Sequence, residues 1–405
     1  MKLARRHASS SAGSQVLLRS RPQPGAAVSV DDFEVAHSSA TSDRLQPNEL
    51  LCQTLMLSVD PFLRCRFNES TGVDYTLPYQ IGQPITSAGV GVVLKSGSSV
   101  SNVQPGDLVL EPFDSWPWTE RCRMPVESVT RIPPALGLLI PPSALLGACG
   151  QPGLTALCGI EHHAAPPGPD DVVVVSAAAG AVGSLVGQLA ARRGATVIGV
   201  CGTDEKAAAL ARLGFAGAVN YRSPDVGGQL DDLLLRVAGG RRVSLYWDNV
   251  GGELSDAIIA RMRDSGGITL CGQISMYDTD EEYPPPLPAA TAAFAAEHAI
   301  SRDRYLLLNH KQQFPAALAE LCRLVASDEL VATETVYDEG GVAGAAASFV
   351  SMMAGGNFGK AVVRCAPLPP RAAAVDRVRR AMPAALREQI CRRFVTPEQF
   401  AGLVG

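Results

Sequence analysis

The sequence predicts an α/β protein in which a doubly wound parallel sheet is joined to a smaller β-rich domain. Residues 15–134 consist of short β-rich runs broken by glycine, proline and serine, which is typical of a compact β-barrel. From about residue 140, apolar runs alternate with alanine- and leucine-rich helical stretches, which indicates parallel strands with crossover helices. A chain of 405 residues also favours two domains over one core.

These runs also predict the individual elements and the domain boundaries. We expect strands at Val172–Ser176, Thr196–Cys201, Ala218–Tyr221, Ser244–Asp248 and Ile268–Cys271, and helices at Val182–Arg193, Glu205–Leu213 and Leu254–Asp264. A helix at Ala316–Ala326 and the run VATETVYD indicate a return to the first domain. The predicted division is a disordered arm (1–14), a first domain (15–140 and 318–365), a second domain (141–317) and an arginine-rich tail (366–405). The tail is open to three interpretations: a solvated helical segment, a docking segment or disorder.

Composition narrows the class of protein. The net charge of −5 indicates no general affinity for nucleic acid or anionic membranes. No apolar run reaches the roughly 20 residues that a bilayer span needs. The ten cysteines form no Cys-x-x-Cys pair, which favours reduced thiols and a cytoplasmic protein. The first fourteen residues are basic and serine-rich, so a disordered arm is favoured over an organelle transit peptide.

The run VVVVSAAAGAVGSLVGQLAARRGATVIGV predicts a dinucleotide site. It combines a buried strand, a glycine turn, a helix and a second strand, with Gly180 and Gly183 at the second and third positions of G-x-G-x-x-G spacing. Gly180 would let the backbone approach a pyrophosphate, and Gly183 would let helix and strand pack closely. The helix N-terminus would offer amide donors to the phosphates. The Rossmann arrangement is therefore favoured over a purely structural turn.

The second strand of this unit favours NADPH over NADH. An NAD site usually carries an acid at the end of that strand, whereas here it runs into Cys201-Gly202-Thr203 and then Lys206. A lysine can pair with a 2′-phosphate. Asp204 is compatible with this interpretation if it caps the next helix. The alternative is that Lys206 is an ordinary exposed helix residue.

Seven motifs, taken together, resemble the prostaglandin reductases of the medium-chain dehydrogenase/reductase superfamily, most nearly the type 2 group of 15-oxoprostaglandin 13-reductases. In chain order they are LSVDPFLRCRFNESTGVDY, GACGQPGLTAL, AAAGAVGS, CGTDEK, YWDNVGG, LCGQISMY and MMAGGNFGK. The resemblance covers residues 15 to about 364. It implies a GroES-like β-barrel domain beside a Rossmann domain, and either a homodimer or a monomer.

The resemblance also implies a set of cofactor-binding residues. Phosphate contacts are expected at Ala179, Gly180, Ala181, Val182 and Gly183, and 2′-phosphate contacts at Lys206 and Tyr221. The nicotinamide side would be lined by Cys271, Gly272, Gln273, Ile274, Ser275, Met276 and Tyr277. Further cofactor contacts are expected at Asn249, Tyr305, Leu306, Leu307 and Asn357. Alternatively, the two asparagines are turn residues and Tyr305–Leu307 belong to the core.

No catalytic zinc is expected. Zinc enzymes of this superfamily need three protein ligands with an open fourth position. The corresponding strand here, ITSAGVGVV, carries no Gly-His-Glu, and the early cysteines are too dispersed for a four-cysteine lobe. The adjacent histidines His162 and His163 are interpreted as a solvated pair.

Without a Lewis acid, the favoured chemistry is reduction of the carbon–carbon double bond of an α,β-unsaturated ketone. Such an enone needs a positioned NADPH and a hydrogen-bond donor for the developing enolate oxygen. Tyr277 is the predicted donor; the alternative is a loop tyrosine with its hydroxyl in water. The predicted substrate-binding residues are Tyr75, Phe113, Asp114, Tyr277, Leu306 and Leu307. The run FDSWPW departs from the family pattern by an extra residue and an acid.

Three functions remain open from the sequence. The favoured one is a 13-reductase acting on 15-oxoprostaglandin-like lipid enones. The second is a broader alkenal or quinone double-bond reductase with the same mechanism and a looser pocket. The third is a catalytically idle NADPH-binding scaffold protein.

Overall fold

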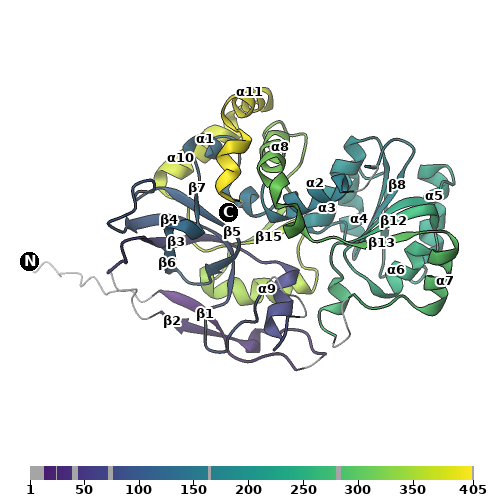
Figure 1. Cartoon of the computed structure of the whole chain (residues 1–405), viewed down its shortest axis with the longest axis horizontal. Coiled ribbons are helices and arrows are strands. Elements are labelled where there is room, and N and C mark those ends of the chain that lie inside the picture. Colours follow the sequence, from purple (N-terminus) through teal and green to yellow (C-terminus); the bar gives the residue numbers. More distant parts are fainter. Residues whose placement is uncertain are drawn as a thin grey trace, which may run out of the picture.

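The protein consists of a β domain and a parallel α/β domain that lie side by side (Figure 1). The structure, a computed structural model, describes residues 13–23, 25–38, 44–71, 76–162, 166–279 and 284–403. Most of the expected arm, residues 1–12, lies outside the described residues, whereas Ser14 begins the first strand. No described helix is long and apolar enough to cross a membrane. The predicted fold class, a Rossmann domain with a GroES-like β domain, is confirmed.

The α/β domain is built on a six-stranded parallel sheet in the order β10-β9-β8-β11-β12-β13. Helices cover both faces of this sheet (Figure 1), and the four valines of β8 are accordingly fully buried. The chain order reverses at β8 and β11, so their carboxyl ends form the switch point where such folds bind ligands. The strands are β8 (Val172–Val175), β9 (Thr196–Cys201), β10 (Gly217–Asn220), β11 (Val243–Asp248), β12 (Met262–Leu270) and β13 (Ser301–Arg304). The helices are α2 (Gln151–Glu161), α3 (Ala181–Arg192), α4 (Asp204–Leu210), α5 (Val226–Ala238), α6 (Gly252–Ile259) and α7 (Ala289–Glu297).

The helix predicted over Leu254–Asp264 is wrong at its C-terminal end. Helix α6 stops at Ile259, and β12 begins at Met262, six residues before the predicted strand. The Arg242 side chain donates to the carbonyls of Ala260 and Met262 at 2.7 and 2.8 Å, and Met262 is fully buried. Tertiary contacts from Arg242, the residue before β11, therefore favour the end of the helix where the local pattern would have continued it.

The β domain contains a seven-stranded sheet with the path β14-β15-β3-β4-β5-β7 and with β6 also paired to β3. A two-stranded sheet, β1 (Ser14–Leu18) and β2 (Phe33–His37), packs beside it. The last two strands come from the far end of the chain, as the run VATETVYD predicts. The larger sheet comprises β3 (Glu49–Ser58), β4 (Thr86–Ser96), β5 (Leu108–Pro117), β6 (Arg121–Pro125), β7 (Thr130–Arg131), β14 (Glu334–Tyr337) and β15 (Lys360–Arg364).

Glycines in β4 make room for the core of this domain. A Cβ atom on Gly91 would lie 2.3 Å from the ring of Trp116, and one on Gly89 would lie 2.4 Å from the same ring. Trp116 is fully buried, and its indole N–H donates to Thr54 Oγ1 at 2.9 Å. The glycines of ITSAGVGVV therefore make room for a buried tryptophan ring against the strand.

The arginine-rich tail folds and packs on the rest of the chain. It forms α10 (Pro370–Ala381), α11 (Ala384–Phe394) and the 3-10 helix η9 (Pro397–Leu403), which lie over α1 (Pro134–Gly137) and α8 (Phe314–Ala326) (Figure 1). Cys391, Val395 and Phe400 are buried in this contact. The remaining helix of the β domain is α9 (Ala345–Met353).

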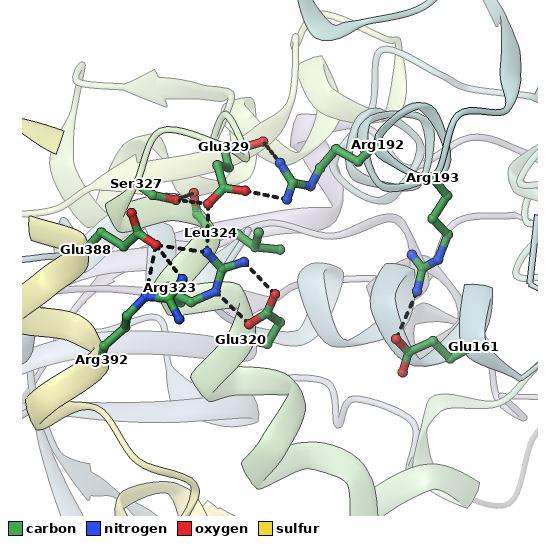
Figure 2. Close-up of polar contacts among 10 residues, drawn as sticks. All are labelled: Glu161, Arg192, Arg193, Glu320, Arg323, Leu324, Ser327, Glu329, Glu388 and Arg392. Atoms are coloured by element: carbon green, nitrogen blue, oxygen red, sulfur yellow. Dashed lines mark hydrogen bonds and ion pairs between the residues drawn. The ribbon is translucent and has the colours of Figure 1, made fainter. Parts of the chain in front are cut away.

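A charged network connects the tail to the α/β domain (Figure 2). Arg323 on α8 pairs with Glu320 and Glu329 at 2.7 Å each and with Glu388 on α11 at 3.5 Å. Glu329 also pairs with Arg192 of α3. Because Arg192 of α3 and Arg323 of α8 share Glu329, and Arg323 also reaches Glu388 of α11, this network couples three helices that are distant in the sequence.

We expect Glu329 to stabilise the fold at neutral pH and to lose this effect in acid. Hydrogen bonds from Ser327, Arg323 and Arg192 hold the pKa of Glu329 at about 2, below its ordinary 4.5. The contribution is thus complete above about pH 4.5 and disappears as the pH falls toward 2. Glu329→Gln should lower the melting temperature at pH 7. The expected decrease is only about 1 to 3 °C, because solvent screens the network.

Thermal melts of both proteins at pH 7 and pH 3 check this expectation, with Glu297→Gln on an exposed helix end as the matched control. The gap between wild type and Glu329→Gln should narrow at pH 3. An equal gap at both values would contradict the pKa argument.

Candidate active site

A cavity of about 450 Å³ lies between the two domains, at the carboxyl ends of β8, β11 and β12. Its walls include most of the residues that the sequence singled out: Phe113, Asp114, Gly180, Ala181, Val182, Gly183, Asn249, Cys271, Gly272, Ile274, Tyr277, Tyr305, Leu306 and Leu307. The cavity is not lined by Ala179, Gln273, Ser275, Met276, Lys206, Tyr221 or Asn357. Tyr75 lies outside the described residues.

The turn between β8 and α3 is shaped to receive a phosphate group. A Cβ atom on Gly183 would lie 2.4 Å from the Ala177 carbonyl oxygen, so helix and turn are in direct backbone contact. Ala177 itself has a φ of 46°, a left-handed conformation that is uncommon for alanine. Helix α3 starts after Gly180 without a side-chain cap, and the residues of its first turn, 181–183, line the cavity, so their amides are candidate donors to a bound phosphate. The residues present therefore fit a dinucleotide.

The β domain supports this turn from behind. The N–H of Gly359 donates to the Ala179 carbonyl at 2.7 Å, and Asn357 Nδ2 donates to the Gly359 carbonyl at 2.7 Å. Ala179 and Asn357 thus brace the turn instead of lining the cavity. Their predicted cofactor contacts stay predictions.

A buried carboxylate at the end of β11 organises the floor of the cavity. Asp248, 1% exposed, accepts hydrogen bonds from Tyr246 Oη at 2.8 Å, from Ser255 Oγ at 2.9 Å and from two backbone amides. It also accepts from Gln273 Nε2 at 2.9 Å, which turns Gln273 away from the cavity. Burial raises the pKa of the Tyr246 hydroxyl, which keeps it a donor. Sequence reasoning missed Asp248, although an acid that closes the apolar strand VSLYWD was an available signal.

The floor also orients Asn249. Its backbone N–H donates to Ser176 Oγ at 2.9 Å, and its Nδ2 donates to the Ser176 carbonyl at 2.7 Å. Asn249 therefore ties the ends of β8 and β11 together and lines the cavity at the same time.

The segment 271–278, here called the Tyr277 loop, runs along this floor. The amides of Ile274 and Ser275 donate to the carbonyls of Asn249 and Val250 at 3.0 and 3.2 Å. Tyr277 lines the cavity, and a Cβ atom on Gly272 would lie 2.8 Å from its hydroxyl oxygen, so the hydroxyl lies over the loop backbone. Burial raises the pKa of Cys271 to about 12. The thiol is thus uncharged near neutral pH, and Tyr277 is the stronger hydrogen-bond donor in the loop.

The predicted 2′-phosphate residues lie outside the cavity, at the carboxyl ends of β9 and β10. Lys206 Nζ donates to the Gly355 carbonyl at 2.7 Å, and burial lowers the pKa of the amine. The helix cap is Thr203, whose Oγ1 accepts from the Lys206 amide, and not Asp204, which accepts from a neighbouring side chain instead. Tyr221 lies against Gly202, with the guanidinium of Arg222 5.9 Å from its ring centre. The sequence had not singled out Arg222.

The substrate side of the cavity is formed by a bulge in β5. Ser87 pairs with Trp116 and Gly89 with Glu111, so residues 112–115 project opposite a single residue of β4. The buried Glu111 carboxylate accepts from the amides of Phe113, Ser115 and Trp116 at 3.0 to 3.3 Å, and burial raises its pKa to about 7. The extra residue of FDSWPW thus belongs to this bulge, which hydrogen bonds to Glu111 stabilise.

This bulge presents Phe113 and Asp114 to the cavity. Asp114 Oδ2 accepts from Arg66 Nη1 at 3.1 Å and from Thr76 Oγ1 at 3.0 Å. The acid is therefore paired with a cation while it lines the cavity. A negatively charged ligand group beside it would still be repelled more than a hydroxyl group.

Sequence reasoning missed one largely buried ion pair beside the cavity. Lys360, 2% exposed, places its Nζ 3.0 Å from Asp60 Oδ1 and donates to the Val59 carbonyl at 2.8 Å. Asp60 lines the cavity. The two residues are 300 positions apart, so no local pattern could connect them.

Across the described ranges, no group of three or more His, Cys, Asp and Glu residues is arranged to hold a metal ion.

Comparisons with known proteins match both domains. The family described as "N-terminal domain of oxidoreductase" matches residues 14–132, and the family described as "Zinc-binding dehydrogenase" matches residues 181–322. Prostaglandin reductase 1 of Mus musculus is 33% identical over 322 residues, 79% of this chain and 90% of the relative. Prostaglandin reductase 1 of Bos taurus is 31% identical over 339 residues, 82% of this chain and 94% of the relative.

A solved structure shows the same arrangement. CurA from Vibrio vulnificus in complex with NADPH superposes with a TM-score of 0.74 at 27% identity, covering 87% of this chain and 99% of CurA. The relatives named above are type 1 reductases, so the likeness to the type 2 group stays a prediction. From its sequence and its fold alike, the chain belongs to the prostaglandin reductases of the medium-chain dehydrogenase/reductase superfamily.

Proposed function

We propose that the protein uses NADPH to reduce the carbon–carbon double bond of α,β-unsaturated ketones. The observation that carries this proposal is the placement of Tyr277 in the same cavity as the uncapped N-terminus of α3. One cavity thus offers a phosphate cradle, an apolar slot and a hydroxyl donor. The names of the mammalian relatives and the NADPH complex of CurA support it.

The chain offers distinct groups to each part of the cofactor. Residues 180–183 would hold the pyrophosphate through backbone amides, and Lys206 and Tyr221 would meet the 2′-phosphate at the outer end. Cys271, Gly272 and Ile274 would lie beside the nicotinamide, where the cavity is lined by the Tyr277 loop. When bound, NADPH supplies the hydride that the reduction consumes.

The remaining chemistry falls to side chains of this chain. As the double bond is reduced, negative charge grows on the ketone oxygen, and the Tyr277 hydroxyl donates a hydrogen bond to that oxygen. Phe113, Leu306 and Leu307 supply apolar walls, and the less polar surroundings would strengthen this hydrogen bond. The enolate is then protonated at carbon by a proton that reaches it from solvent.

The substrate that we favour is a 15-oxoprostaglandin-like lipid ketone reduced at the 13,14 double bond. Phe113 and the two leucines suit an alkyl chain, and Asp114 favours a substrate hydroxyl over a carboxylate at its end of the cavity. Tyr75 is proposed to meet the polar end of the substrate. A broader alkenal or quinone reductase would use the same donor with less selectivity.

The experiment that tests the function mixes purified protein with NADPH and 15-oxoprostaglandin E2, follows absorbance of the reduced nicotinamide, and identifies the product by mass. NADH, a short alkenal and a quinone run in parallel. We expect NADPH-dependent formation of the 13,14-dihydro ketone. Faster turnover of the alkenal or quinone would favour the broader reductase. Binding of NADPH without turnover of any substrate would favour the idle scaffold and reject the proposal.

A further inference from the structure

Arg64 forms an ion pair between the two domains, immediately beside the proposed hydrogen-bond donor. Its Nε lies 2.6 Å from Asp278 Oδ1, and its side chain is only 2% exposed. Arg64 lies in the 3-10 helix η2 (Pro61–Phe67) of the β domain, whereas Asp278 follows Tyr277 in the α/β domain. Among the described residues, Asp278 is the only carboxylate that pairs with this guanidinium.

The guanidinium is held rigidly on its own side. Nη1 donates to Asn68 Oδ1 at 2.7 Å, and Nη2 donates to the Ala26 carbonyl at 2.9 Å. Both partners are neutral groups of the β domain. Two of the three guanidinium nitrogens thus fix the orientation of the fork, and the third is directed at Asp278.

The Tyr277 loop is anchored differently at its two ends. At its start, Gln273 and Ile274 are bound at 2.9 and 3.0 Å to Asp248 and Asn249, at the carboxyl end of β11. At its end, the side chain of Asp278 is bound across the domain boundary to Arg64. The position of Tyr277 therefore depends on both domains.

The ion pair also joins the two walls of the cavity. Pro61 and Phe62, from the same 3-10 helix as Arg64, line the same cavity as Ile274 and Tyr277 of the loop. A loop released from Arg64 would be free to move its tyrosine away from this wall. A displacement of about 1 Å from the reacting atoms can cost on the order of a hundredfold in rate.

We propose that Arg64 and Asp278 are positioning residues: their ion pair holds the Tyr277 loop against η2, so that the tyrosine hydroxyl stays directed at the substrate ketone. This inference rests on the proposed function of Tyr277. Asp278 does not line the cavity, so an effect of its substitution on turnover would not arise from direct contact with substrate or cofactor.

The decisive variant is Asp278→Asn, which keeps an acceptor of the same size and removes the charge. We expect kcat to fall by about tenfold to a hundredfold, with the Kd for NADPH unchanged and faster hydrogen exchange in the Tyr277 loop. In a Tyr277→Phe background the same substitution should change kcat by less than about twofold, because the group it positions is gone. Asp278→Glu, which keeps the charge, should restore most of the lost turnover.

The matched control is Asp231→Asn. Asp231 pairs with Arg261 at 2.7 Å, and neither residue lines the cavity, so this variant removes the charge of an ion pair remote from the site. It should leave kcat unchanged. If Asp278→Asn does not fold, Arg64→Lys tests the same contact, because lysine keeps the charge but cannot reproduce the fork. A lower melting temperature with unchanged kcat and unchanged loop exchange would overturn the inference and leave the proposed function intact.

A wild-type protein that reduces no enone would instead reject the proposed function. Hydrogen exchange of the loop, which needs no turnover, then decides whether Arg64 holds it. Exchange that is equal in wild type and Asp278→Asn would reject the positioning role as well.

Discussion

Replacing Tyr277 with phenylalanine is expected to lower kcat for enone reduction by about tenfold to a thousandfold, the usual range for loss of one oxyanion donor. The hydroxyl is the group that we assign to the developing enolate, and phenylalanine keeps the ring while it removes the donor. The Kd for NADPH should change little, because the phosphate turn at Gly180 and Gly183 is untouched. The loss should therefore appear in kcat, and in kcat/KM to the same extent.

Steady-state kinetics with NADPH and the enone, together with NADPH binding by fluorescence, measure both quantities. Tyr337→Phe is the matched control, since Tyr337 lies on β14 and does not line the cavity. If Tyr277→Phe turns over as fast as wild type, another group must stabilise the enolate, and the proposed mechanism fails at this residue.

Gly183→Ala is expected to impair both folding stability and NADPH binding. Its Cβ atom would lie 2.4 Å from the Ala177 carbonyl oxygen and 2.9 Å from Ala178 Cα, and neither is a flexible side chain. Overpacking of this kind typically costs about 1 to 3 kcal/mol. Because the displaced atoms form the phosphate turn, the Kd for NADPH should rise by at least about tenfold, a change of 1.4 kcal/mol.

Gly180→Ala separates the two effects. Gly180 has a φ of −85°, and the nearest atom to an added Cβ is the Ala177 carbonyl oxygen at 3.1 Å. The added methyl group is therefore crowded much less than one on Gly183, but it occupies the space that a pyrophosphate needs. We expect Gly180→Ala to melt near the wild-type temperature with weakened NADPH binding, and Gly183→Ala to melt several degrees lower. Equal melting temperatures for all three proteins would refute the packing argument for Gly183.

The local motifs account for what could be predicted. The strand, turn and helix of residues 172–192 follow from valine burial and glycine spacing within about twenty residues, and the structure has them within one residue of the prediction. The second strand, Thr196–Cys201, agrees at both ends. In each case the deciding interactions are between neighbours in the chain, so the pattern carries the information.

The sequence did not predict features that depend on contacts between residues far apart in the chain. The helix over Leu254–Asp264 is cut short by Arg242, and Gln273 is drawn into the floor by Asp248. The ion pairs Arg64–Asp278 and Asp60–Lys360 join residues that are more than two hundred positions apart. The pairing of such charges depends on which surfaces the folded domains bring together.

The sequence by itself determined the fold class, the dinucleotide turn and the identity of the candidate donor, Tyr277. The tertiary structure alone decided which walls enclose the cavity, that the acid of FDSWPW is paired with Arg66, and that the Tyr277 loop is tied to the other domain. The reason is physical: backbone conformation and amphipathic periodicity are set by adjacent residues. The environment of a buried charge, in contrast, is set by whatever partner the fold places within hydrogen-bond distance.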